Sequence, residues 1–114
     1  MNKEIKKQLC KNWFKLLQEI ICNEIENLES NSTKFISKNW SKHLSKDEGG
    51  GEYRILKDGK IFDKVGVNFS EVYGKFSNEM KKNIPGAKKN PNFWASGISV
   101  VMHMKNPNIP AMHF

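Results

Sequence analysis

Three side chains near the end of the sequence have the types and spacing to do chemistry together. Ser99 and His103 lie four residues apart in a segment of alternating apolar residues, and His113 follows ten residues after His103. Histidine titrates near neutral pH, so it suits proton transfer and, when neutral, metal binding. On a strand, this spacing puts Ser99 and His103 on one face, about 13 Å apart. That distance is too long for one metal ion or for a nucleophile–base pair, but it suits contacts with two parts of one large ligand.

The link between the two histidines contains Pro107 and Pro110, which restrict its backbone. If this link reverses the chain, we expect His103 and His113 to become neighbours on adjacent strands. Two histidines alone form an incomplete metal site. The residues by themselves therefore leave a catalytic role, a metal role and an ordinary polar role open, and His43 matches no motif and is expected at the surface.

A second polar region precedes these residues. Gly49–Gly51 lacks the Gly-Lys-Ser sequence of a phosphate loop, so it is either a flexible connector or a point of close backbone approach to a ligand or a neighbouring strand. Arg54 is the only arginine and offers a fork of donors to a carboxylate, although a structural ion pair explains it equally well.

Composition limits the class of protein. The 114 residues suffice for one small domain, with a net charge of +7 from 19 Lys and Arg against 12 Asp and Glu. Such a charge is compatible with nucleic-acid binding, but the lysines are scattered and no zinc-finger or RNA-binding signature is present. We interpret the lysines as a solvated surface, which would also attract a small anionic substrate.

The cysteines and the hydropathy pattern bear on location. Cys10 and Cys22 fall in one predicted helix about 18 Å apart, too far for a disulfide, which favours a reducing compartment. The N-terminus lacks the apolar stretch of a signal peptide, and no segment approaches the length of a membrane span. We expect a cytoplasmic protein with no membrane span.

The order of predicted elements is helices first and strands afterwards, which indicates an α+β fold. Apolar spacing predicts a long helix over residues 3–28 whose apolar stripe packs on the domain. The stripe consists of Ile5, Leu9, Trp13, Leu16, Leu17, Ile20, Ile21, Ile25 and Leu28.

Shorter elements are expected to follow this helix. Asn31, Ser32 and Thr33 end it and cap a short second helix that contains Phe35, Ile36 and Trp40. A polar loop follows at 45–51, and a hairpin with a two-residue turn at Asp58-Gly59 joins a strand around Tyr53 and Ile55 to one at 61–69. Residues 74–92 form a surface connection with one helical turn, and 93–104 form the strongest strand, with Ser99 and His103 on the face opposite Ile98 and Val100.

Several blocks, taken in this order, resemble oxygen-dependent coproporphyrinogen III oxidase. The blocks are DEGGG at 47–51, RILKDG at 54–59, VGVNFS at 65–70 and FWASGISVVMHMKNPNIPAMHF at 93–114. The resemblance covers roughly residues 40 to 114. It implies a large antiparallel sheet flanked by helices on both faces, of which residues 1–114 form the N-terminal part of a single domain.

The resemblance also implies an activity and site residues. Family members oxidatively decarboxylate two of the four propionates of coproporphyrinogen III to vinyl groups, using O2 and no organic cofactor, and give protoporphyrinogen IX. This substrate calls for cations near its propionates, for which Lys57, Lys64 and Arg54 are candidates. Ser99 matches a substrate-binding serine, His113 matches the proton donor, and Arg54 matches the family's arginine. His103 and His113 match positions described as metal ligands, so a divalent metal stays an open possibility.

The family pattern continues beyond Phe114 with further site residues and a region that forms a homodimer. We therefore expect these 114 residues alone not to catalyse turnover. The alternative to an oxidase is a non-catalytic basic module that binds tetrapyrroles or nucleic acid; the oxidase reading predicts coproporphyrinogen III as partner and no nucleic acid.

Overall fold

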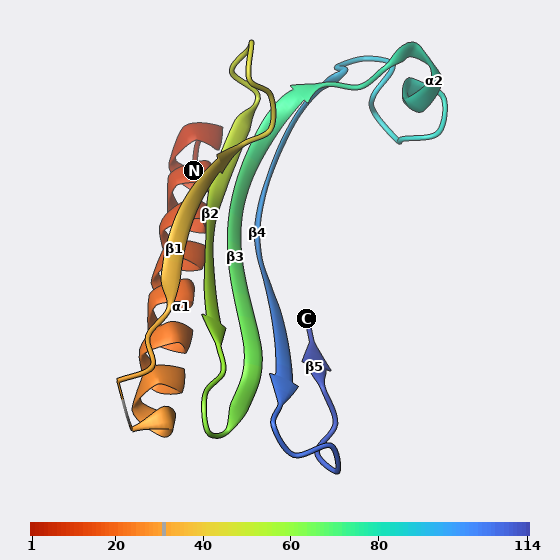
Figure 1. Cartoon of the computed structure of the whole chain (residues 1–114). Coiled ribbons are helices and arrows are strands. Elements are labelled where there is room, and N and C mark those ends of the chain that lie inside the picture. Colours follow the sequence, from red (N-terminus) through yellow and green to blue (C-terminus); the bar gives the residue numbers. More distant parts are fainter. Residues whose placement is uncertain (31) are drawn as a thin grey trace.

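The computed structural model describes residues 1–30 and 32–114 and contains one antiparallel sheet with a long helix along one face (Figure 1). The strands are hydrogen-bonded in the order β1-β2-β3-β4-β5. This arrangement confirms the α+β fold. The elements are α1 (Lys3–Glu29), β1 (Ile36–Ser41), β2 (Gly49–Lys57), β3 (Phe62–Lys75), α2 (Asn78–Lys81), β4 (Asn92–Met104) and β5 (Met112–His113).

Helix α1 has a defined start and end. The Asn2 side chain caps the first turn by accepting a hydrogen bond from the Ile5 N–H at 2.9 Å. The helix stops at Ser30, whose backbone turns left-handed with a φ of 48° and whose N–H donates to the Glu26 carbonyl. The 27 residues span about 40 Å, so α1 runs most of the length of the sheet. The predicted helix over 3–28 is confirmed, and within the described chain no helix is long and apolar enough to cross a membrane.

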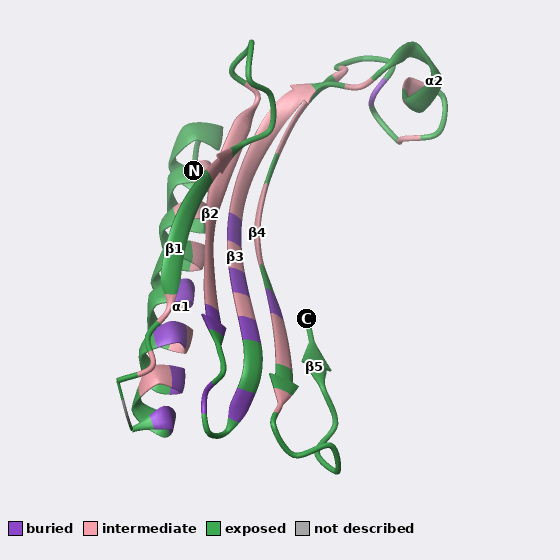
Figure 2. Ribbon diagram, viewed as in Figure 1, coloured by how far each residue is buried: buried purple, intermediate pink, exposed green. Residues whose placement is uncertain are grey.

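The face of α1 that packs on the sheet overlaps only in part with the predicted one. The buried residues are Gln18, Cys22, Ile25 and Glu29, which lie in the C-terminal half of the helix (Figure 2). Much of the predicted stripe is solvent-exposed instead. Ile5, Leu9, Trp13, Leu16 and Ile20 are 45–58% exposed.

Two buried polar side chains explain this difference. Gln18 Nε2 donates to the backbone carbonyls of Glu52 at 2.9 Å and Val67 at 3.1 Å. The Glu29 carboxylate accepts hydrogen bonds from the backbone N–H groups of residues 60–62 in the β2–β3 turn. A polar side chain is buried at low cost when it is fully hydrogen-bonded. Apolar spacing alone does not register such bonds, so the predicted stripe overlaps the packed face only in part, for example at Ile25.

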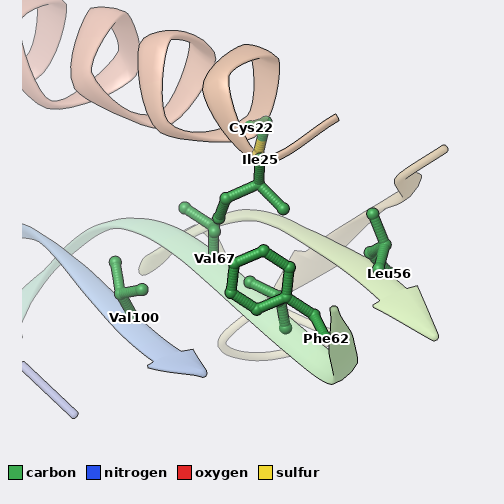
Figure 3. Close-up of a cluster of buried hydrophobic side chains, with 7 residues drawn as sticks. Cys22, Ile25, Leu56, Phe62, Val67 and Val100 are labelled. Carbon is green, nitrogen blue, oxygen red and sulfur yellow. The ribbon is translucent and has the colours of Figure 1, made fainter. Parts of the chain in front are cut away.

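The core lies between the C-terminal half of α1 and the half of β2, β3 and β4 that is nearer the β2–β3 turn, the lower half in Figure 2. Alternate residues of the strands point toward the helix, so Val65, Val67 and Val100 are fully buried. They pack with side chains from both layers in one cluster (Figure 3). Its other members are Cys22, Ile25, Leu56 and Phe62. We call the sheet surface on this side the helix face, and the surface directed away from α1 the open face.

The short second helix predicted around Phe35 and Trp40 is wrong, because this segment forms strand β1. Its residues pair antiparallel with β2, from Ile36 opposite Ile55 to Trp40 opposite Gly51. The edge of β2 offers a row of backbone donors and acceptors, and pairing with it overrides local helical spacing. Asn31, the first of the three predicted capping residues, lies outside the described residues.

Gly49–Gly51 begins β2 and is not part of a loop, so the polar loop ends at Glu48. A Cβ atom on these three glycines would lie only 2.1, 2.1 and 1.9 Å from backbone carbonyl oxygens of the paired strands. The glycine run is therefore not a flexible connector; it allows close approach of the backbone to the neighbouring strands. Any other residue would push the strands apart here.

The remaining predictions for the strands are largely confirmed. The hairpin at Asp58-Gly59 is present, although four residues, 58–61, connect β2 to β3. Strand β3 extends beyond the predicted 61–69, while α2 and β4 match the predicted helical turn and final strand. Cys10 and Cys22 are both free, as expected.

Candidate active site

Strand β5 brings the two C-terminal histidines together. Residues 105–111 reverse the chain, and β5 then pairs antiparallel with β4, with His113 opposite Val101. The His103 and His113 rings lie 5.5 Å apart between centroids, at an angle of 57°. Two backbone bonds between Val100 and Phe114, of 2.7 and 3.0 Å, fix this register. The expected neighbourhood of the histidines is therefore confirmed.

Ser99 shares the open face with both histidines. Ser99 and His103 flank Val101 on β4, and Val101 is the residue opposite His113. In an antiparallel pair such diagonal neighbours have their side chains about 7–8 Å apart. His113 therefore lies between Ser99 and His103, and all three side chains are exposed. The arrangement presents one hydroxyl and two imidazoles to a ligand lying on the sheet.

A neighbouring strand adds a polar group that the sequence did not reveal as part of a site. Asn68 in β3 lies directly opposite Ser99. Its side-chain oxygen accepts a hydrogen bond of 3.0 Å from Trp40 Nε1, so the carboxamide is held in one orientation. The NH2 group of Asn68 then stays available as a donor. Alternation in the VGVNFS block places Asn68 on the open face, but the partnership with Trp40 depends on β1, which was predicted as a helix.

Arg54 lies on the other side of the sheet. It donates to Glu19 of α1 at 2.7 Å and to Glu52 of its own strand at 2.9 Å. Hydrogen bonds from Arg54 and Ser37 hold the pKa of the Glu52 carboxyl below its usual value. Burial lowers the pKa of Arg54, but its bonds to Glu52 and Glu19 outweigh burial and raise it. The structure thus places Arg54 in an ion-pair cluster on the helix face and does not bring it to Ser99 and the histidines.

The same cluster borders Cys22. Burial raises the pKa of this thiol to about 11, despite the nearby Arg54 guanidinium. A thiol with such a pKa is almost entirely protonated at neutral pH and is a poor nucleophile. Cys22 therefore belongs to the packing of α1 and not to a reactive site.

The residues that could hold a metal ion are His103 and His113. Among residues 1–30 and 32–114, no group of three or more His, Cys, Asp or Glu side chains converges on a point. A protein metal site of this kind commonly uses three or four ligands. The histidine pair can supply two of them. His43, at the far end of the sheet, lies 3.4 Å from Glu48 and is an exposed surface residue, as expected.

Comparison with known proteins shows to which family the chain belongs. Residues 9–114 match the protein family described as coproporphyrinogen III oxidase. A curated relative from Rickettsia felis, named oxygen-dependent coproporphyrinogen-III oxidase, is 41% identical over 116 residues, covering 95% of this chain and 40% of the relative. Relatives of the same name from Rickettsia akari and Rickettsia bellii are 41% and 40% identical, covering 95% and 100% of this chain and 40% and 42% of those proteins. The chain thus spans about two fifths of the length of the curated relatives it matches, and it belongs to the coproporphyrinogen III oxidase family.

Proposed function

We propose that this chain supplies the part of an oxygen-dependent coproporphyrinogen III oxidase that binds the porphyrinogen and exchanges protons with it. The observation that carries the proposal is the gathering of Ser99, His103 and His113 on the open face of one sheet. A flat tetrapyrrole needs an extended surface with polar groups at separated points, and a sheet face offers this. The relatives' shared name supports the same reaction.

The proposed reaction is balanced without an organic cofactor. Each reacting propionate side chain loses its carboxyl group as CO2 from one methylene and a hydrogen with its electron pair from the other methylene, which is bonded to the pyrrole; the two carbons then form the double bond of a vinyl group. One O2 takes up the two electrons and, with two protons, becomes H2O2. His113 would donate or accept a proton at the pyrrole, because imidazole exchanges protons near neutral pH. Ser99 would hold the substrate through its hydroxyl group.

Further features of the complete enzyme belong to the same proposal. We place it in the cytoplasm as a homodimer that binds no nucleic acid, with O2 as oxidant, in line with the family resemblance. A divalent metal at His103 and His113 would need ligands beyond these two. Of the two roles open to Arg54, its ion pairs with Glu19 and Glu52 support the structural one.

A chimaeric enzyme tests this function. Residues 1–114 replace the aligned segment of the Rickettsia felis relative, and conversion of coproporphyrinogen III to protoporphyrinogen IX is measured under air. We expect turnover by the chimaera, a fall in kcat of about 100-fold or more for His113→Asn, and a several-fold higher KM for Ser99→Ala.

His43→Asn provides the matched control, because it removes an exposed histidine that is remote from the open-face cluster. We expect it to leave kcat and KM unchanged. A folded chimaera that turns over equally well with and without His113 would contradict the proposal.

A further inference from the structure

We propose that a lysine-lined groove on the open face of β1 and β2 binds the propionates of the tetrapyrrole that lie away from His113. This inference rests on the proposed function and adds a second point of attachment for the same substrate. The groove has a volume of about 390 Å3. Its lining residues are Lys34, Ile36, Lys38, Tyr53, Ile55 and Lys57.

The sheet register connects this groove to the Ser99 end of the site. Lys38 of β1 lies opposite Tyr53, Tyr53 lies opposite Asn68, and Asn68 lies opposite Ser99. These four residues form one row across four strands. With a spacing of about 4.8 Å between strands, the row is about 14 Å long. A porphyrinogen is about as wide, so one molecule lying on the open face reaches both ends.

The charges of the sheet are divided between its two faces. On β1 and β2, the strand positions that point to the open face carry Lys38 and Lys57 and no carboxylate. Glu52 and Glu71 point to the helix face, where they bond with Arg54 and Lys11. The open face is therefore cationic around the groove on β1 and β2, which favours an anionic ligand there.

The lysines of the groove are also available for a ligand. Within the part of the chain that the structure describes, Lys38 and Lys57 have no ion-pair partner. Lys34 makes only a long contact of 3.9 Å with Glu26. Because lysine carries its charge on a long flexible stem, several such groups can follow propionates of differing direction.

The floor of the groove suits the rest of the ligand. Ile36 and Ile55 lie opposite each other, with Tyr53 beside them. This surface is apolar, and the lysine amino groups rim it. A tetrapyrrole combines an apolar ring with carboxylates on its edge, so its chemistry matches both parts. Nucleic acid would use the lysines but not the isoleucines.

Binding of coproporphyrin III, the stable oxidised tetracarboxylate, to the 114-residue chain tests the inference. Dissociation constants come from quenching of the porphyrin fluorescence at fixed salt. We expect the double variant K38Q/K57Q to weaken binding at least tenfold. The control K88Q/K89Q removes the same charge from an exposed segment outside the sheet and should change binding less than twofold. Protoporphyrin IX, with two propionates, should lose less affinity than coproporphyrin III in the groove variant.

The position of the ligand is measured independently by NMR. Methyl signals of Ile36 and Ile55 should shift when coproporphyrin III is added, together with the signals of Ser99 and His113. Circular dichroism shows whether each variant is folded, and these exposed lysines should leave the melting temperature unchanged.

The outcomes separate the two proposals. If S99A/H113A weakens binding while K38Q/K57Q matches its control and the isoleucine methyls do not shift, the groove inference is overturned and the proposed function stands. If the wild-type chain binds no coproporphyrin III, or binds only single-stranded RNA with a steep salt dependence, both proposals fail.

Discussion

Glu29 shows how a single buried acid joins the two layers of the molecule. Its side chain is 2% exposed, and its carboxylate accepts hydrogen bonds of 2.6, 3.1 and 2.8 Å from the N–H groups of Lys60, Ile61 and Phe62. Gly59 packs so close that a Cβ there would lie 2.2 Å from the carboxylate. Burial raises the pKa of Glu29, but the three backbone bonds outweigh burial and lower it. The end of α1 thus stabilises the turn that joins β2 to β3.

We predict that Glu29→Gln lowers the free energy of unfolding by about 2–4 kcal/mol at pH 7, because an amide presents a donor to backbone donors. A depressed folded-state pKa contributes stability that is present above the usual value of 4.5 and is lost as pH falls through the folded-state pKa. Such acids lose their contribution to stability between about pH 5 and pH 1. The free energy of unfolding of the variant should therefore fall less between pH 5 and pH 3 than that of the wild type. Urea unfolding at several pH values measures both effects.

Glu24→Gln, on the exposed side of α1, is the control for Glu29→Gln. Equal losses of unfolding free energy in the two variants would refute the role of Glu29.

Trp40 and Asn68 form the residue-scale link between the edge of the sheet and the candidate site. The indole N–H donates to the Asn68 oxygen at 3.0 Å, and Gly51 leaves room for the indole, whose Cε2 would lie 3.0 Å from a Cβ at that position. The bond orients the carboxamide beside Ser99. Trp40 therefore acts as a positioning residue for the open face.

We predict that Trp40→Phe releases the Asn68 carboxamide and costs about 0.5–1.5 kcal/mol of stability, because the ring is kept but the donor is lost. The NMR signals of the Asn68 side-chain NH2 should shift and broaden. Trp94→Phe removes an equivalent indole bond, to Glu71 on the helix face at 3.0 Å, and is the matched control. Unchanged Asn68 signals in Trp40→Phe, or the same change in Trp94→Phe, would show that Trp40 does not orient this side chain.

At the scale of elements, α1 has two faces that are both rich in apolar residues. One face buries Cys22 and Ile25 against the strands, whereas the other leaves Leu9 and Trp13 more than half exposed. The choice between them follows from hydrogen bonds: Gln18 and Glu29 find backbone partners only on the sheet side. Polar groups thus decide how an apolar helix docks.

Ile25→Ala should destabilise the chain by about 2–4 kcal/mol, because Ile25 is 3% exposed and belongs to the core cluster. Leu9→Ala deletes a similar side chain that is 54% exposed, and it should cost less than about 0.5 kcal/mol. Thermal or urea unfolding of the two variants under one condition measures the difference. A larger loss for Leu9→Ala would mean that the part of the predicted stripe around Leu9, and not the face around Ile25, packs on the sheet.

At the scale of the whole molecule, the sheet separates charged side chains that form ion pairs near α1 from lysines that face solvent on the other side. Arg54, Glu52 and Glu71 bond on the helix face, while Lys38 and Lys57 stand on the open face. A net charge of +7 reveals nothing of this division, because composition carries no direction. The division is the basis for expecting an anionic tetrapyrrole on the open face, tested by the groove variants and the chimaera.

The sequence by itself determined the long helix, the hairpin at Asp58-Gly59, strand β4 and the shared face of Ser99 and His103. These features depend on local spacing, turn chemistry and alternation, all of which are properties of neighbouring residues. The sequence also carried the blocks by which the family is identified. Even the pairing of His103 with His113 could be anticipated, since only a short restricted link separates them.

The tertiary structure alone decided three other features. It converted the segment around Trp40 into an edge strand, turned α1 onto its Gln18–Glu29 face, and placed Arg54 on the side away from Ser99 and His113. Each depends on partners distant in the sequence, such as Glu19 for Arg54 and the carbonyls of Glu52 and Val67 for Gln18. A hydrogen bond or strand pairing between distant segments leaves no periodic trace in either one, so only the folded chain reveals it.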